Sequence, residues 1–388
     1  MPSPRQALAS RCRKTLVGGL IGCLVLHITL VVITDQVLPE LRDPEYGFKL
    51  ARLRERLRQE PDRPLLLLLG SSRTGYGLRP EAAADWRTPN GESPIVYNFG
   101  LTGSGPILEL LCLHRLLRAG IHPDRVIIEV MPPNLHQEGS WAETNWIGIN
   151  RLGWDDVQRL RRYAEAPKQL CLDWWRMHGS PWYAQRFCIL SRYAPGWLPW
   201  ETRQDIWLGL DRSGWMIYPN TVLNPAQQRR ALEFARRHYA PAFVNFHITD
   251  AADRALRDLL TVCRRQGIAA TLLLMPEGPE FQSWYPPTAR AEIDAYLSRV
   301  SHEYCVAVID ARGWLPETAF FDSHHLHPDG ATVFTQRFSR ELCKPAPVPG
   351  RPSLSERPSG ADLRGLFAVG IDSERVHERR EISVGEGQ

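Results

Sequence analysis

Residues 65–77 read LLLLLGSSRTGYG, and this stretch decides the fold of the chain. Five consecutive leucines between Pro64 and Gly70 are typical of a strand buried on both faces, as strands in parallel sheets are. The glycine and two serines that follow end the strand in a tight turn. The stretch therefore predicts a parallel α/β sheet with polar groups at the carboxyl end of its first strand.

The alternation of strand and helix continues along the chain. Four more apolar segments are typical of strands: residues 95–99, 125–131, 268–275 and 305–311. Helical spacing of apolar residues is found at about residues 106–119, 250–266, 288–304 and 328–343. Strands that alternate with helices are joined by right-handed crossovers and form parallel sheets. We therefore predict a doubly wound, three-layer α/β/α domain over residues 64–343.

An uncharged apolar run lies near the N-terminus, from Thr15 to Thr34. About 20 residues at helical rise match the bilayer core, so the run predicts a transmembrane helix. The run is long for a signal-peptide core and no A-x-A site follows it, which favours a retained anchor over a cleaved signal. The basic residues within 1–14 should stay in the cytoplasm, which places the main domain outside it, in the periplasm or at the cell surface.

Three regions lie outside the predicted sheet and its helices. Ten of the 13 tryptophans fall within residues 132–241, where the alternation stops, and we predict a mostly helical insertion there. Their rings either form a helical core or line a groove for sugar rings or an acyl chain. Residues 35–63 are expected to form a linker and an amphipathic helix. Residues 344–388 have too few large apolar side chains to fold, which predicts a disordered tail.

Composition makes some classes of function improbable. The formal net charge is only +4 and the arginines are scattered among acids, so we expect no nucleic-acid partner. No C-x-x-C spacing occurs, which argues against a zinc or redox motif. Cys112, Cys263 and Cys305 lie in apolar patterns and are interpreted as core residues. Cys171 and Cys188 lie in an irregular region and are able to pair in an oxidising compartment.

Two distant segments carry residues suited to catalysis. Ser72 follows the first strand, and DSHHLHPDGA, residues 322–331, leads into the last predicted helix. A serine hydroxyl is a poor nucleophile unless a base takes its proton and a carboxylate orients that base. Asp322 and His325 have the spacing for this, so we predict a serine esterase site. His327 is the fallback base, and we expect His324 to face solvent or cap the loop.

Other interpretations of these segments stay open. Three histidines and two aspartates within residues 322–329 also fit a metal site. No second ligand cluster occurs in the sequence, so we expect neither a metal nor another cofactor. Ser72 is not in the nucleophile elbow G-x-S-x-G, because Thr74 stands where the elbow has glycine. The turn after the first strand also fits a phosphate-binding or purely structural turn.

The two segments resemble blocks of the SGNH/GDSL hydrolases, which supply a nucleophilic serine, an oxyanion glycine, an oxyanion asparagine and a D-x-x-H pair. The likeness is greatest to the membrane-anchored branch related to the domain-of-unknown-function 1574 proteins, and looser to bacterial cell-surface O-acetylation proteins. GSSR at residues 70–73 matches the first block, with Ser71 in place of the usual Asp. Residues 322–330 match the last block, with His327 in place of the usual Asn.

The two middle blocks match less closely. NFGLTG at residues 98–103 resembles N-x-x-x-x-G, which implies Gly103 as an oxyanion donor, with Gly100 as the alternative. The third block, G-x-N-D, is absent. Asn134 stands one residue later than the pattern, where it is either the side-chain donor or a turn residue after two prolines. The resemblance therefore implies an oxyanion hole formed by Ser72, Gly103 and Asn134.

The resemblance implies an SGNH-like, flavodoxin-like fold and a membrane-anchored esterase acting on an acyl ester. A cell-surface polysaccharide is one candidate carrier of that ester. In this mechanism Ser72 attacks the acyl carbonyl, His325 takes the serine proton and Asp322 orients His325. Two alternatives stay open: an O-acyltransferase to a glycan with the same triad, and a non-catalytic glycan-binding or assembly protein. The sequence indicates no particular protein partner.

Overall fold

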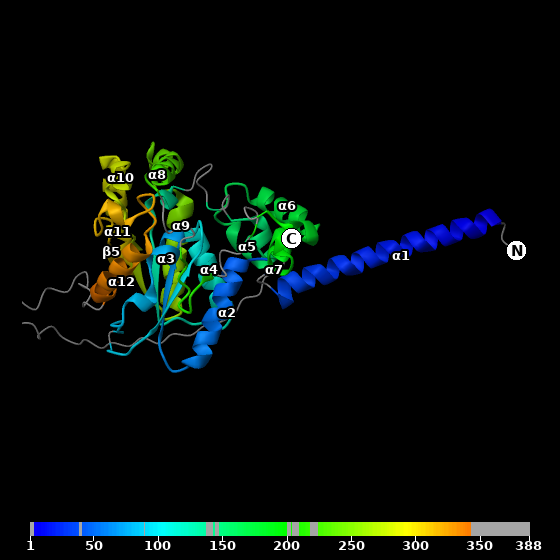
Figure 1. Ribbon diagram of the computed structural model, residues 1–388, viewed down its shortest axis with the longest axis horizontal. Helices are drawn as coiled ribbons and strands as arrows, with labels where there is room; N and C mark the ends of the chain where they lie inside the picture. The colour runs from blue at the N-terminus through cyan, green and yellow to red at the C-terminus, as the bar shows by residue number, and fades with distance from the viewer. Residues whose placement is uncertain are drawn as a thin grey trace, which may run out of the picture. The chain divides into compact units, whose positions relative to one another are not determined.

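The computed structural model describes residues 4–38, 41–88, 90–136, 143, 147–199, 203, 209–217 and 224–342. At its centre is a five-stranded parallel sheet with the strand order β2-β1-β3-β4-β5 (Figure 1). The strands are β1 (Leu65–Gly70), β2 (Ile95–Gly100), β3 (Arg125–Glu129), β4 (Ala269–Leu274) and β5 (Ala307–Asp310). β1 and β2 each extend one residue beyond a segment predicted as a strand, and the other three strands lie inside such segments. The predicted α/β class with a parallel sheet is confirmed.

The strand order places the leucine-rich β1 inside the sheet, between β2 and β3. The chain therefore runs outward from β1 to β2, returns past β1 to β3, and continues to β4 and β5. Because parallel crossovers are right-handed, steps in opposite directions carry their connections on opposite faces of the sheet. The order is also one of the two common doubly wound orders, in which ligands bind beyond the carboxyl ends of the strands.

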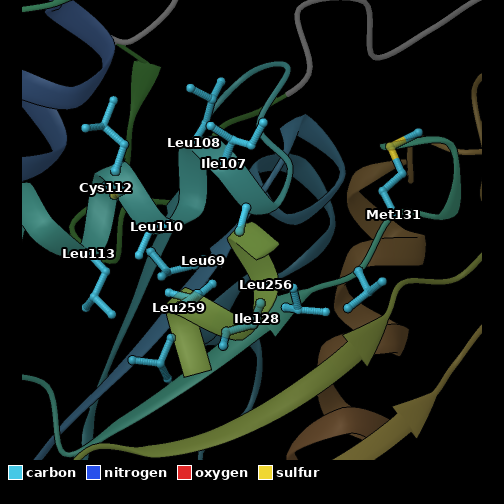
Figure 2. Packing of buried hydrophobic residues seen from close by; sticks show 14 of the residues in the cluster. Leu69, Ile107, Leu108, Leu110, Cys112, Leu113, Ile128, Met131, Leu256 and Leu259 are labelled. Carbon is cyan, nitrogen blue, oxygen red and sulfur yellow. The ribbon is translucent and has the colours of Figure 1, made fainter. Parts of the chain in front are cut away.

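One face of the sheet is covered by four helices. These are α2 (Pro44–Gln59), α4 (Pro106–Arg118), α9 (Asp250–Arg265) and α11 (Pro287–Tyr304). The odd-numbered leucines of β1 face this layer, and Leu67 is fully buried there. Figure 2 shows part of the cluster, in which side chains of α4 and α9 meet those of β1 and β3.

The opposite face is covered by α3 (Ser72–Gly77) and α12 (Pro328–Leu342). The even-numbered leucines of β1 point this way, and Leu68 belongs to a second apolar cluster with Phe334 and Phe338 of α12. All three side chains are completely buried. Since both faces of β1 are packed, a continuous apolar run is the pattern this strand requires.

The N-terminal residues form α1 (Pro4–Val32), which continues into the helical turn η1 (Ile33–Val37). Residues Arg11–Val32 are long and apolar enough to cross a membrane. This agrees with the predicted transmembrane segment in length and composition. A cleaved signal sequence has the same properties, so the retained anchor and its orientation stay predictions.

The segment between β3 and α9 is largely helical where the structure describes it. Its α-helices are α5 (Trp154–Leu160), α6 (Pro167–His178), α7 (Pro181–Tyr193) and α8 (Pro225–Tyr239). Trp174 and Trp215 are buried, as a helical core predicts. Four other tryptophans are exposed: Trp154, Trp175, Trp182 and Trp197. Outside the described residues lie Trp141, Trp146, Trp200, Trp207 and the predicted tail, residues 344–388.

None of the described cysteines forms a disulfide, Cys171 and Cys188 included. Cys112 and Cys263 are buried in the core, as predicted. Cys305 is exposed, so its interpretation as a core residue is wrong. The residue ends α11 in a left-handed conformation with φ 54°, which turns its side chain out of the strand pattern that follows.

A buried lysine connects α2 to the sheet and to the insertion. Nζ of Lys49 donates hydrogen bonds to the carbonyl oxygens of Asn98 (3.0 Å) and Gly214 (2.6 Å). Lys49 is completely buried, and this burial lowers its pKa to about 8. The two carbonyl contacts therefore hold an amine whose charge is costly in the folded state.

The pKa of Lys49 predicts a pH-dependent stability. The unfolded chain keeps the lysine proton up to a pH of about 10.4, so between pH 8 and 10 it binds more protons than the folded chain. The free energy of unfolding of the wild type should therefore rise over this interval, relative to Lys49→Met, by about 2 kcal/mol. Denaturation in urea at both pH values measures the difference. Parallel pH profiles would show that Lys49 is charged in the folded protein.

Candidate active site

The structure brings Ser72, His325 and Asp322 together at the carboxyl edge of the sheet. Ser72 Oγ lies 2.8 Å from Nε2 of His325, and Nδ1 of His325 lies 2.9 Å from Oδ2 of Asp322. The backbone N–H of His325 donates to Oδ1 of the same carboxylate at 2.8 Å. Asp322 therefore fixes both the ring and the backbone of His325. These contacts have the geometry of a nucleophile, its base and an orienting carboxylate.

The position of Ser72 follows from the turn that ends β1. Ser71 is the N-cap of α3, where its Oγ accepts a hydrogen bond from the N–H of Arg73 at 3.1 Å. A Cβ at Gly70 would lie 2.2 Å from Oγ1 of Thr74, so only glycine fits before the cap. Ser72 then becomes the first helical residue, directly beyond the carboxyl end of the strand.

The loop that carries Asp322 and His325 is fastened by Ser323. This residue has φ 68°, a conformation that is unfavourable for a residue with a side chain. Its Oγ accepts from the N–H of Phe281 at 2.9 Å and its carbonyl oxygen accepts from the N–H of Gly278 at 2.7 Å. These bonds attach the loop to the segment after β4 and hold the strained backbone in place.

The electrostatics of the site keep Asp322 ionised. Its side chain is buried, and burial opposes the negative charge. The neighbouring His324 and His325 outweigh this effect and hold the pKa of Asp322 well below its usual range. Ser72 and His325 are half-buried, so the two reacting groups are within reach of a ligand from solvent while the carboxylate is shielded.

His324 does not face solvent, so the first of its two expected roles, facing solvent or capping the loop, is wrong. Its side chain is buried, and Nδ1 lies 3.1 Å from the carbonyl oxygen of Asp322. The ring of Tyr239, from α8 of the insertion, packs against it with 4.8 Å between ring centroids, and Phe281 lies on it at 5.4 Å. Burial lowers the pKa of His324, which favours the neutral ring.

His327, the fallback base, is directed to other partners. Its ring packs on Phe321 with 3.8 Å between centroids, and its backbone N–H donates to the carbonyl oxygen of Ala319 at 2.9 Å. His325 is therefore the histidine that contacts Ser72. The choice between the two histidines made from their spacing is the one that the geometry supports.

The two predicted oxyanion residues lie on the loops that flank Ser72. Gly103 follows β2 and Asn134 follows β3, and β1 lies between these strands. Gly103 has φ 74°, a conformation that favours glycine. Nδ2 of Asn134 donates to the carbonyl oxygen of Ser104 at 2.9 Å, which connects the two loops. Their role as oxyanion donors stays a prediction.

A buried glutamate supports the nucleophile turn, and the sequence interpretation missed it. Oε2 of Glu129, the last residue of β3, accepts from the N–H of Ser71 at 2.8 Å and from Oγ1 of Thr74 at 2.7 Å. Ser71 Oγ donates to the same carboxylate at 3.0 Å. A charged residue at the end of a buried strand is rare without a partner. That signal was present in the sequence, although it does not identify the partner.

Arg73 is a second buried charge beside the nucleophile. Its guanidinium donates to Oε1 of Glu277 at 3.3 Å and to the carbonyl oxygens of Met275 and Pro276 at 3.1 and 3.0 Å. Burial opposes the positive charge, but Glu277 and Glu129 outweigh it and raise the pKa of Arg73. Arg73 therefore attaches the first turn of α3 to the segment after β4.

The side chains of the loop that carries Asp322 and His325 also resemble a metal site. Ligand atoms of Asp322, His324 and His325 lie within 4.8 Å of one another. However, Nδ1 of His325 is already hydrogen-bonded to Asp322, and its Nε2 is hydrogen-bonded to Ser72. A metal at Nδ1 would displace the carboxylate from the ring. The observed contacts therefore favour the use of His325 as a base.

Parts of the insertion pack against the nucleophile helix. The N–H of Met216 donates to the carbonyl oxygen of Gly75 at 3.1 Å, and Nε1 of Trp215 donates to that of Tyr76 at 2.7 Å. Trp215 therefore stabilises the position of α3. A separate pocket of about 650 Å³ lies in the insertion and includes Tyr183 in its lining, but Ser72 does not line it. The candidate site is therefore identified by its hydrogen-bond geometry and not by this pocket.

Comparisons with known proteins match part of the chain. One family model, of uncharacterised proteins, matches residues 246–346. The matched segment runs from before α9 to the end of α12 and contains Asp322 and His325, whereas Ser72 lies outside it. No curated protein matches the chain.

The contacts of Glu129 predict a loss of stability when its charge is removed. Glu129→Gln keeps the size of the side chain but weakens the hydrogen bonds from Ser71 and Thr74. Hydrogen bonds to a charged group contribute about 1.5–3 kcal/mol, and we expect a loss of that order in the free energy of unfolding. The matched change Glu55→Gln alters an exposed residue of α2 and should cost less than about 0.5 kcal/mol. Urea denaturation of both variants tests this. Equal effects would show that the Glu129 carboxylate does not stabilise the turn.

Proposed function

We propose that the chain is a serine hydrolase of SGNH type that acts on an acyl ester. The observation that carries the proposal is the continuous series of contacts from Ser72 through His325 to Asp322. In the proposed reaction, Nε2 of His325 takes the proton of Ser72, and Ser72 Oγ attacks the acyl carbonyl. His325 then gives that proton to the leaving alcohol, and a water molecule hydrolyses the acyl-serine.

The arrangement of the loops supports the assignment to the SGNH type. The proposed nucleophile follows the first strand of the sheet, and the D-x-x-H pair precedes its last helix. The N–H groups of Ser72 and Gly103 and the side chain of Asn134 would stabilise the oxyanion. Their loops follow three adjacent strands of a flavodoxin-like order, which supports their convergence at one edge.

We also propose that α1 anchors the enzyme in a membrane. Arg5, Arg11, Arg13 and Lys14 precede its uncharged run, which begins at Thr15, and this favours a cytoplasmic N-terminus and an α/β domain outside the cytoplasm. The substrate would then be an ester on the outer side of this membrane. Esters of cell-surface polysaccharides belong to this class.

Transfer of the acyl group to a glycan hydroxyl would use the same three residues. The observation that favours transfer is the packing of α8 against the catalytic loop, where Tyr239 contacts His324 and Gln228 reaches the carbonyl oxygen of Phe320 at 3.4 Å. Where such a cover keeps water from the acyl-serine, a competing hydroxyl has the advantage.

Covalent labelling tests the nucleophile. Full-length protein in detergent should react with a fluorophosphonate probe at Ser72, and Ser72→Ala should abolish the adduct because it removes the oxygen that contacts Nε2 of His325. Ser283→Ala, at an exposed serine, is the matched control and should be labelled as wild type is. Intact-mass spectrometry and peptide mapping locate the adduct.

A kinetic test examines the carboxylate that orients His325. Asp322→Asn should lower the rate of aryl acetate hydrolysis by about 10⁴.

Three outcomes separate the candidate functions. A folded wild-type protein that stays unlabelled contradicts catalysis and favours a glycan-binding or assembly role. Labelling with rapid acetate release that ignores an added oligosaccharide supports the esterase. Acetate that appears on the oligosaccharide, at the expense of release into water, supports the acyltransferase.

A further inference from the structure

Large apolar side chains are exposed on one part of the insertion. Outside α1, most of the exposed large apolar side chains in the described residues lie between residues 154 and 197. The aromatic surface, as we name it, consists of Trp154, Leu172, Trp175, Trp182, Tyr193 and Trp197. Trp197 is 81 % exposed. Trp154 and Trp175 contact each other, with 5.6 Å between ring centroids. Exposed apolar groups that gather on a surface mark interaction sites.

The aromatic surface follows the periodicity of its helices. Leu172 and Trp175 are three residues apart on α6 and therefore share a face. Trp182 and Tyr193 are eleven residues apart on α7, which is about three helical turns, so they share a face too. Each helix thus presents an apolar face to the outside instead of isolated side chains.

The tryptophan side chains in this surface are supported from beneath. Buried Trp174 packs against Trp154 with 5.0 Å between ring centroids and against Trp175 with 5.1 Å. Nε1 of Trp174 donates to the carbonyl oxygen of Leu152 at 2.8 Å. The exposed rings are therefore held in place before any partner binds, which reduces the entropy lost on binding.

The aromatic surface lies close to the point where α1 meets the α/β domain. α1 contacts α7. A few residues after η1, Asp43 accepts from Nε of Arg151 at 2.9 Å. Nη1 of Arg42 lies beside Gly153, directly before α5. The chain that leaves the candidate span is therefore bound at once to the segment that carries the aromatic surface.

The chemistry of this surface fits a lipid interface. Tryptophan and tyrosine are the residues enriched at the boundary between the bilayer core and water. Exposed basic side chains lie on the same helices, at Lys168, Arg176 and Arg192, of which Arg176 pairs with Asp173. Basic side chains beside an exposed apolar surface are attracted to anionic lipids. The aromatic side chains fit the boundary of the bilayer core, and the basic side chains fit the headgroup layer.

We propose that the aromatic surface of α5, α6 and α7 docks onto the lipid bilayer beside α1. The proposal rests on the membrane span proposed for α1. It goes beyond that span, because one membrane helix alone does not fix the orientation of the domain relative to the membrane. Docking gives the domain a second attachment and a defined orientation on the membrane. It also accounts for exposed tryptophans that neither the core of the insertion nor the catalytic site uses.

Quenching of tryptophan fluorescence by brominated lipids tests the docking. No tryptophan precedes Trp86 in the chain, so α1 is silent and quenching reports the domain alone. Full-length protein is reconstituted in nanodiscs of phosphatidylcholine and phosphatidylglycerol, brominated near the headgroup. We expect clear quenching of the wild type, and at least a twofold loss of the quenched intensity in the combined variant Trp175→Ser, Trp182→Ser, Trp197→Ser. Trp314→Phe, which alters a ring packed against Phe334 of α12, is the matched control and should keep that intensity.

The outcomes distinguish docking from anchoring and from catalysis. If the protein inserts into nanodiscs but wild type is not quenched, or the combined variant is quenched as strongly, docking is wrong and the anchor stands. In that case crosslinking at these positions would identify a protein partner instead. A chain that fails to enter nanodiscs refutes both the anchor and docking. Fluorophosphonate labelling of Ser72 in the same samples reports on the proposed activity independently of these results.

Discussion

The buried carboxylate of Glu129 holds together the segments that meet at the carboxyl edge of the sheet. It accepts hydrogen bonds from the backbone and side chain of Ser71 and from the hydroxyl of Thr74. It also lies 3.7 Å from Nε of Arg73, which in turn bonds Glu277. The turn after β1 is thus bound to β3 and to the segment after β4, and Ser72 has its position because of these contacts.

Burying this network of charged groups costs free energy, and the cost limits how much the network stabilises the fold. Buried ion pairs often add little net stability, because the loss of hydration offsets their attraction. A hydrophobic contact would stabilise the same space without fixing a direction. Hydrogen bonds from Ser71 and Thr74 instead fix the orientation of the first turn of α3. In the proposed enzyme this orientation keeps Ser72 within 2.8 Å of His325 before a substrate arrives.

The insertion connects this site to the rest of the molecule in two ways. Residues 209–217 and α8 pack against α3 and the loop of Asp322 and His325, through Trp215 and Tyr239. Helices α5 to α7 turn other tryptophans outward, near the end of α1. The tryptophan-rich region therefore has buried aromatic side chains that support the site and exposed ones that form a separate surface.

Much of the fold, and the contact between Asp322 and His325, was predictable because the relevant patterns are local. A continuous run of leucines predicts a strand packed on both faces, and β1 is that strand. Asp322 and His325 are three residues apart, so their contact needs only a loop, and the residue types at Ser72 and His325 indicate the chemistry. The length and apolar character of Arg11–Val32 likewise identify a candidate membrane span.

Tertiary structure alone decided the features that depend on distant partners. The sheet order, which places the turn of Ser72 between the loops after β2 and β3, follows from long-range pairing. His324 is buried because Tyr239, far away in the sequence, covers it. Glu129 and Arg73 are charged residues whose partners no periodicity reveals. By itself the sequence determined the strands, the helices and the chemical types at the site, because these arise from neighbouring residues. The burial of charges and the exposure of tryptophans depend on what packs against them, and only the folded chain decides that.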